Sequence, residues 1–548
     1  MKIVSRLSFF CGLLPLIAAG LYAQSATQPS SSNESQVLHS DQTLRTNTRL
    51  VLVDVVATDS KGQPVPDLKA SDLTVLEDGK PQKISGFNFE RSDASSARVA
   101  QIQLPPSVVT NAPKFQSNSL NVILFDTANG DFTEQVYAHD QLLKFLNGAA
   151  LDRPVAIFAL QTQLKLLHDF STDNKALSAA VAKYRPPAKN NNSESMESRA
   201  SAFSTRGDYH TSERDIENTL NQLNVLAKVL AGYPGRKNLI WLSESFPLTL
   251  FPETLNQGHM DGQSLRSAVR GAANPASTQQ NLVSSAPFKT YAELVKKVSD
   301  ALMSAQVAVY PVDAGAVGRN DHLASQHTMN NMAESTGGKS FMNSNDLVLG
   351  LRNGIEDGSS YYTLTYYPEN KNWDGLFRRI QVKSSRPNLS LRYREGYYAV
   401  DPEKINKQDS DAVAENFSRL LELDAPTATQ VIFQAQVQPP SEKNKKVVVT
   451  FHIDPRTLAF EKKDNGVEFA KLSCTVWAYG KDRDKPTMSS GTVTANLSAS
   501  EYQQMMQQRF LPCDRQLDLK PGTYALRMGV LDRASNKIGT ATAQVAVP

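Results

Sequence analysis

A short apolar run that ends in a carboxylate constrains the fold of this chain more than any other feature. Residues 120–125 are apolar apart from Asn121, and Asp126 follows them directly. A run of this length between turn-forming residues is typical of a strand buried on both faces. Residues 132–146 then form an amphipathic pattern that predicts a helix. Strand, turn and helix make the first unit of an open α/β sheet, in which ligands bind outside the carboxyl ends of the strands. We therefore expect Asp126 at a binding edge.

The same pattern repeats through residues 118–358. Further apolar runs predict strands at 154–160, 238–242 and 307–312, and 164–169 is expected to pair back against the first of these. Helices are predicted at 174–184, 212–231, 291–305 and 345–356. Alternating strands and helices indicate a mostly parallel, Rossmann-type sheet covered on both faces. Two long polar stretches, 185–210 and 252–287, are predicted to be excursions from this domain.

Strands without helices between them are predicted on both flanks of this domain. The N-terminal set is 49–58, 73–76 and 82–89, and the later set is 361–367, 377–384 and 389–393. Neither set has enough strands to be stable alone. We therefore expect residues 47–90 and 359–400 to build one β-sandwich, with the α/β domain inserted into it. Residues 91–117 are polar and are predicted to be a linker.

Residues 411–548 are predicted to be a separate domain. After a short helix at 412–423 the pattern is all-β, with turn signals between short strands, which favours an immunoglobulin-like sandwich. Cys474 and Cys513 both lie in this region. Two cysteines in one domain of an exported protein predict a disulfide, with two buried free thiols as the alternative.

The N-terminus carries the pattern of a signal peptide. Lys2 and Arg6 precede an apolar run at 7–19, and a cleavage site is expected after Ala23. Residues 24–46 are rich in Ser, Thr, Asn and Gln and predict a disordered leader. The protein is thus expected to be periplasmic or extracellular, with no transmembrane helix after cleavage. A net charge of +3 without a basic tract gives no reason to expect a nucleic acid partner.

Several strings in this sequence resemble the VWFA-related family described from Acidobacteria, and more generally the von Willebrand factor type A (VWA) domain. The strings are RLVLVDVV at 49–56, LEDGKPQKI at 76–84, YPGRKNLIW at 233–241, AQVAVYPVDA at 305–314 and YYTLTYY at 361–367. The resemblance covers about residues 47–399 and leaves out the C-terminal domain. It implies a VWA-like fold, in which the strand at 238–242 lies between those at 120–125 and 307–312.

The resemblance also implies a candidate cation site for Mg²⁺ or Ca²⁺. The family motif is Asp-x-Ser-x-Ser after the first strand, with a second Asp from a later loop. Asp126 matches the first position, but Ala128 and Gly130 stand at the serine positions, and Glu244 is found where the second Asp is expected. Neither Ala128 nor Gly130 supplies a side-chain oxygen for a hard cation, so the site is degenerate. The alternative is that Asp126 caps the following turn or helix.

These observations lead to one functional hypothesis and two alternatives. We expect an exported, non-enzymatic, adhesion-type protein that recognises a protein partner at the top of the α/β sheet, around Asp126, Asn129, Glu244 and Asp313. A cation, if bound, would use Asp126 and Glu244. The alternatives are a hydrolase that uses the same cleft and a scaffold of the cell envelope without a ligand there. Glycine-rich phosphate loops, nucleophile elbows and zinc-type histidine spacings are absent from the sequence.

Overall fold

The computed structural model describes residues 50–548 except for 92–97, 100–103, 117–118, 129–131, 149–150, 187–212, 244–297, 315–322, 343–345, 400–409, 443, 464–465, 484 and 509. The predicted signal peptide and leader, most of the excursion at 185–210 and all of that at 252–287 lie outside the described residues. Among the described helices, none is long and apolar enough to cross a membrane.

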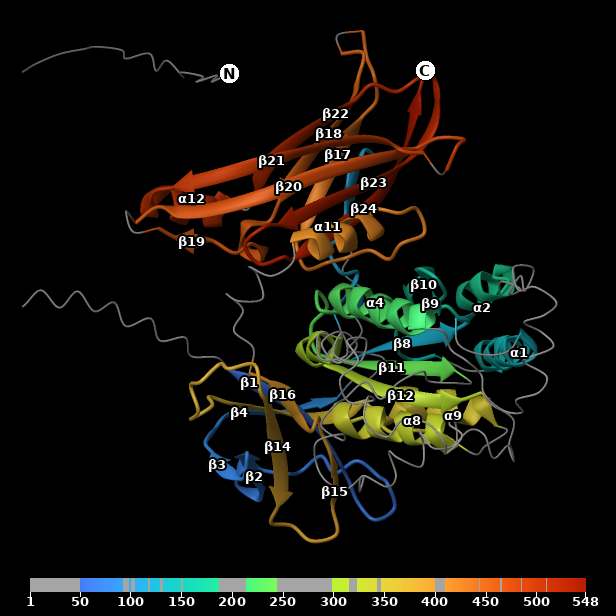
Figure 1. Ribbon diagram of the computed structural model, residues 1–548, viewed down its shortest axis with the longest axis vertical. Helices are drawn as coiled ribbons and strands as arrows, with labels where there is room; N and C mark the ends of the chain where they lie inside the picture. Colours follow the sequence, from blue (N-terminus) through green and yellow to red (C-terminus); the bar gives the residue numbers. More distant parts are fainter. Residues whose placement is uncertain are drawn as a thin grey trace, which may run out of the picture. The chain divides into compact units, whose positions relative to one another are not determined.

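The α/β domain contains a five-stranded sheet (Figure 1). Its strands, in spatial order, are β10 (Leu164–Ser171), β9 (Val155–Leu160), β8 (Ser119–Asp126), β11 (Arg236–Ser243) and β12 (Val307–Asp313). The last four are parallel, and β10 runs antiparallel to β9. The order β8, β11, β12 is the one that the VWA resemblance implied, and the return of β10 against β9 is also confirmed.

Helices cover both faces of this sheet, which explains why its four parallel strands are buried along their whole length. One face packs against α1 (Phe132–Gly148), α2 (Asn174–Lys183) and α9 (Leu347–Asp357). The other packs against α4 (Glu213–Leu230) and α8 (Leu323–Thr336). Side chains of a strand alternate between faces. On β8, Ile123 therefore joins the core under α1, while Val122 joins the core under α4.

The two flanks of the α/β domain form one β-sandwich, with strands from both flanks in each of its two sheets. The first sheet has the order β15 (Ser390–Arg392), β1 (Val51–Thr58), β13 (Ser360–Tyr366), β4 (Ile84–Arg91). The second has the order β16 (Gly396–Tyr398), β14 (Phe377–Ser384), β2 (Leu73–Glu77), β3 (Lys80–Gln82). The expected pairing between N-terminal and later strands is therefore confirmed.

The C-terminal region is all-β apart from α11 (Ser410–Arg419), α12 (Ala499–Gln508) and a short 3-10 turn. One sheet contains β22 (Leu511–Leu517), β18 (Val447–Ile453), β17 (Phe433–Gln438) and β6 (Val108–Thr110). The other contains β19 (Glu461–Lys462), β20 (Glu468–Tyr479), β23 (Gly522–Asp532) and β24 (Ile538–Val547), with β21 (Thr487–Leu497) also paired to β20. Side chains from both sheets share one apolar core.

Two expectations differ from the structure of this region. Residues 91–117, predicted to be only a linker, contribute β6 to the C-terminal sheet, where it pairs with β17. Asn111 fixes this strand by donating to the carbonyls of Ala428 and Val431 and accepting from the Phe433 amide. The predicted disulfide is also not formed, since Cys474 and Cys513 are both free and buried. Folding alone brings the two thiols together, whereas a bond between them needs an oxidant.

Candidate functional site

Three strands of the α/β sheet end at one edge, and each ends in a polar residue. The parallel register places Leu242 beside Phe125, and Ser243 beside Asp313. Asp126 ends β8, so it lies next to the end of β11 on the side opposite to Asp313. With neighbouring strands about 4.8 Å apart, the two carboxylates are about 10 Å apart along this edge. The expectation that Asp126 and Asp313 share one edge is confirmed, whereas Asn129 and Glu244 lie outside the described residues.

The Asp126 carboxylate is buried and accepts at least three hydrogen bonds. Its Oδ2 atom accepts from Trp241 Nε1 at 3.1 Å and from Ser243 Oγ at 2.9 Å. Its Oδ1 atom accepts from the amide of Ala128 at 3.0 Å, which is the turn-capping contact expected as the alternative to metal binding. A carboxylate has about four acceptor sites. Asp126 is therefore committed to holding β8, β11 and the following turn together.

The oxygen atoms described at this edge do not by themselves fit a divalent cation. Mg²⁺ and Ca²⁺ take six or more oxygen ligands. Three of the Asp126 acceptor sites already have donors, and Asp313 Oδ2 accepts from Gln326 Nε2 on α8 at 3.3 Å. Within the described part of the chain, no group of three or more His, Cys, Asp and Glu side chains could hold a metal ion. We therefore derive no step through a metal at this edge.

Hydrogen bonds among hydroxyl and amide groups extend from this edge toward β9. Thr127 Oγ1 contacts the Leu160 carbonyl and the Tyr184 hydroxyl, both at 3.0 Å, and Gln161 Nε2 also donates to Tyr184. Burial raises the pKa of the Tyr184 phenol, and so does the charge of Asp126, while the two side-chain hydrogen bonds act in the opposite direction. The phenol is therefore neutral at physiological pH. The sequence reading had missed this network, although polar residues directly after the apolar run of β9 were a visible signal.

An exposed apolar stripe starts next to this edge on α1. Phe132 is 52% exposed, and Val136 and Tyr137 are each 39% exposed. Phe132 and Val136 are four residues apart and so lie on the same side of the helix. Only residues 127–131 separate β8 from α1, so the stripe begins near the carboxyl end of β8. The amphipathic pattern predicted the helix but not this second apolar side, because Leu142 and its neighbours already account for the buried side.

Ser243 and Asp126 also meet the distance criterion for a nucleophile and its base. Their oxygen atoms are 2.9 Å apart, but Ser243 is only 1% exposed. A nucleophile must contact its substrate, and this hydroxyl is enclosed. Among the described histidines, His139 and His168 bond to backbone carbonyls of other residues. Neither His139 nor His168 therefore forms the Ser–His pair that the hydrolase alternative would most readily use.

Comparisons with known proteins give weak likenesses. No protein family model matches the chain, and no curated protein matches it. Among solved structures, the vWF domain of the type V pili tip protein Mfa5 from Porphyromonas gingivalis is 10% identical, with 43% of this chain and 93% of that chain covered and a TM-score of 0.26. The von Willebrand factor type A protein from Catenulispora acidiphila is 10% identical, with 57% and 72% covered and a TM-score of 0.22.

A third solved structure is proximal thread matrix protein 1 from the mussel byssus. It is 10% identical, with 44% of this chain covered and a TM-score of 0.24, and this chain spans about half (48%) of its length. TM-scores at this level carry no argument about function. The description of the α/β domain as VWA-like therefore depends on its own strand order and on its helices on both faces.

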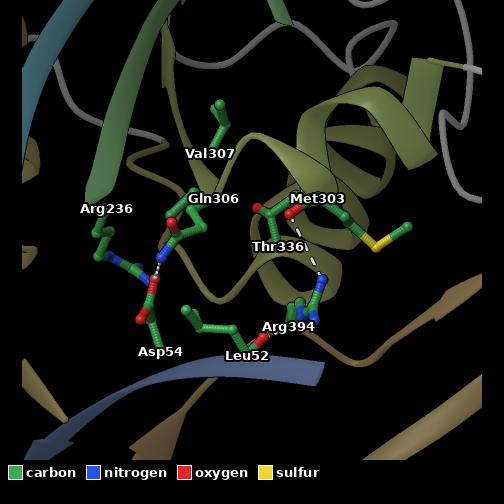
Figure 2. Close-up of a pocket in the computed structure, with 9 residues that line it drawn as sticks. Leu52, Asp54, Arg236, Met303, Gln306, Val307, Thr336 and Arg394 are labelled. Carbon is green, nitrogen blue, oxygen red and sulfur yellow. Dashed lines mark hydrogen bonds between the residues drawn. The ribbon is translucent and has the colours of Figure 1, made fainter. Parts of the chain in front are cut away.

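A second polar site lies at the opposite, amino-terminal ends of β11 and β12. Figure 2 shows Asp54 of β1, Arg236, Gln306 and Arg394 around a cavity of about 20 Å³, which is room for about one water molecule. Gln306 Nε2 donates to Asp54 Oδ2 at 3.1 Å, and Arg394 donates to the carbonyls of Leu52 and Met303. These contacts join the sandwich strand β1 to the α/β domain, so the site is best explained as a structural joint.

Lys237, next to Arg236, is buried without an ion pair among the described contacts. Its side chain is 1% exposed, and Nζ donates to the carbonyl of Tyr233 at 2.9 Å. Burial lowers the pKa of Lys237 to about 7, and the charge of Asp54 only partly opposes this. Desolvation disfavours the charged amine. Lys237 is therefore an energetic cost in the core of the α/β domain.

Proposed function

We propose that this protein is an exported, non-enzymatic binding protein that recognises a protein partner at the carboxyl edge of its α/β sheet. The observation that carries this proposal is the exposed stripe of Phe132 and Val136 beside an edge that contains Asp126 and Asp313. Exposed apolar residues next to polar groups are typical of protein interaction sites. Asn129 and Glu244 follow β8 and β11 closely in the sequence and are proposed as further contacts.

The chemistry of the edge suggests the kind of partner. Both carboxylates are buried and hydrogen-bonded within the chain, so a basic group of a partner would lie over this edge and relieve the repulsion between their charges through space, without a direct bond to Asp126. Phe132 and Val136 would then contact apolar side chains of the same partner, inside a polar rim. The proposed partner is thus a protein surface with an apolar centre and at least one Lys or Arg.

The test is capture of a partner from a cell-envelope extract by the immobilised protein, with matched variants. The double variant Phe132→Ala and Val136→Ala should lose at least about 90% of the specific capture, because a central apolar anchor contributes about 2 kcal/mol or more. Leu376→Ala is the control, since Leu376 is also exposed, at 67%, but belongs to the sandwich flank. Equal capture by the two variants would refute the proposed site.

The hydrolase alternative has a separate test. It is favoured by the 2.9 Å contact between Ser243 and Asp126 and opposed by the burial of Ser243. If Ser243 is not a nucleophile, a fluorophosphonate probe should not label it, and Ser243→Ala should keep partner capture. Labelling that disappears in Ser243→Ala would support the enzyme.

Export through cleavage of residues 1–23 is part of the same proposal. The charged start, the short apolar run and the small residue at position 23 support it. Mass spectrometry of the protein from the extracytoplasmic fraction should find Gln24 as the first residue. A mature protein that begins at Met1 would contradict this part of the proposal.

A further inference from the structure

Two buried thiols meet at the seam between the two sheets of the C-terminal domain. Cys474 lies on β20, and Cys513 lies on β22, the edge strand of the facing sheet. Both side chains belong to the same apolar core, and both are almost fully enclosed. The sequence predicted a disulfide here, with two buried free thiols as the alternative, and the structure has the two free thiols in contact.

The contacts around the pair make the two thiols different from each other. The interaction between the two thiol groups raises the pKa of Cys474 and lowers that of Cys513. Burial opposes the lowering at Cys513, and Arg515 supports it. The Arg515 guanidinium donates from Nη2 to Cys513 Sγ at 3.2 Å, and from Nε to the carbonyl of Cys474 at 3.2 Å. A neighbouring cation and a donated hydrogen bond both favour a thiolate.

A glycine makes room for this guanidinium. Gly491 on β21 pairs directly with Cys474. A Cβ atom at this position would lie 2.4 Å from Nη1 of Arg515. The missing side chain thus allows Arg515 to lie half-buried against both thiols. Two cysteines that only fill the core would not need a guanidinium beside them, because buried structural thiols are inert in apolar surroundings.

We propose that Cys474 and Cys513 are a redox-active pair in which Cys513 is the nucleophile, Cys474 is the resolving thiol and Arg515 is the positioning residue. The oxidant would be a small disulfide, which reaches the enclosed Cys513 sulfur when the edge strand β22 opens locally. The Cys513 thiolate attacks one sulfur of that disulfide, breaks its S–S bond and releases one thiolate. Cys474 then loses its proton, attacks Cys513 Sγ and displaces the second thiolate. Two protein thiols lose two electrons and two protons in total, and the external disulfide becomes two thiols. The product is a bond that links β20 to β22.

The first test uses the wild-type protein that begins at Gln24, in which Cys474 and Cys513 are the two cysteines, reduced and then incubated with hydroxyethyl disulfide. We expect both thiols to disappear from titration of the unfolded protein, and peptide mapping to find Cys474 linked to Cys513. In Cys474→Ser, Cys513 should keep the hydroxyethylthiol adduct, because no resolving thiol is present. Two thiols that remain titratable in the wild type, or a bond between two copies of the chain, would overturn the proposal.

The second test concerns Arg515. Arg515→Gln should slow oxidation at neutral pH about tenfold and move the pH profile of the rate upward, because a smaller fraction of Cys513 is then thiolate. Arg533→Gln is the matched control, since Arg533 contacts Ser473 Oγ on the same strand as Cys474 but has no described contact with either sulfur. A rate and a pH profile that are unchanged in Arg515→Gln would remove Arg515 from the proposal. The melting temperature of each variant is measured as well, so that a slower reaction in a folded Arg515→Gln protein can be told apart from a loss of folding.

Discussion

Replacing Lys237 with methionine should stabilise the α/β domain at neutral pH. The amine is buried, and its pKa falls from 10.5 to about 7 in the folded protein. Below pH 7 both the folded and the unfolded states carry the charge, and the folded state has the full cost of burying it. Between pH 7 and 10.5 only the unfolded chain is protonated, so the cost shrinks as the pH rises, and above 10.5 it is gone.

The magnitude follows from the two pKa values. At about 1.36 kcal/mol per pH unit, the full cost is roughly 5 kcal/mol, and it falls from roughly 4 kcal/mol at pH 7.5 to roughly 1.5 kcal/mol at pH 9.5. Methionine loses the hydrogen bond to the Tyr233 carbonyl, which contributes about 1 kcal/mol. Lys237→Met should therefore be more stable than the wild type by about 3 kcal/mol at pH 7.5 and by almost nothing at pH 9.5.

Urea unfolding followed by Trp241 fluorescence measures this difference. Trp373 and Trp477 are the other two tryptophans of the chain, and both should be changed to phenylalanine in each protein that is compared. Lys237→Gln serves as a second variant that is neutral but polar. A variant less stable than the wild type at pH 7.5, or a stability difference that does not change with pH, would refute the reasoning.

Two further predictions concern the edge and the sandwich core. Addition of Ca²⁺ or Mg²⁺, or of a chelator, should not change the melting temperature, because the described oxygens of Asp126 already have donors; a rise that Asp126→Ala abolishes would show that a cation binds. Glu77→Leu should destabilise the protein by about 3–5 kcal/mol in urea unfolding. Glu77 accepts hydrogen bonds from Tyr366, Tyr397 and the buried Arg378, and the charge of Arg378 would lose its partner. Little or no change in Glu77→Leu would mean that Arg378 finds another partner.

The sheet of the α/β domain could be predicted from the sequence because its strands bury both faces. Such strands are mostly apolar, so β8 and β12 are visible as apolar runs, and each run ends at an aspartate that marks the edge. The shared sandwich could also be predicted, because neither flank had enough strands to be stable alone. In both cases the pattern that predicts the structure lies in consecutive residues of the sequence.

The features that could not be predicted depend on register and on short segments. The bond from Trp241 to Asp126 exists because β11 lies beside β8 in one particular register, which consecutive residues do not show. β6 has three residues and no measurable periodicity, so its pairing with β17 is not visible in the sequence. The thiol pair was visible as two cysteines, but the role of Arg515 required the close approach of Gly491.

Site-specific photo-crosslinking tests the central claim most directly. A benzoylphenylalanine placed at position 132, next to the carboxyl edge, should form a crosslink to a partner in envelope extract. A benzoylphenylalanine at position 376, on the sandwich flank, should not form a crosslink, although Leu376 is more exposed than Phe132. The account predicts one dominant product from position 132, and weaker product when Asp126→Asn is added. Crosslinks from position 376 with none from position 132 would contradict the account.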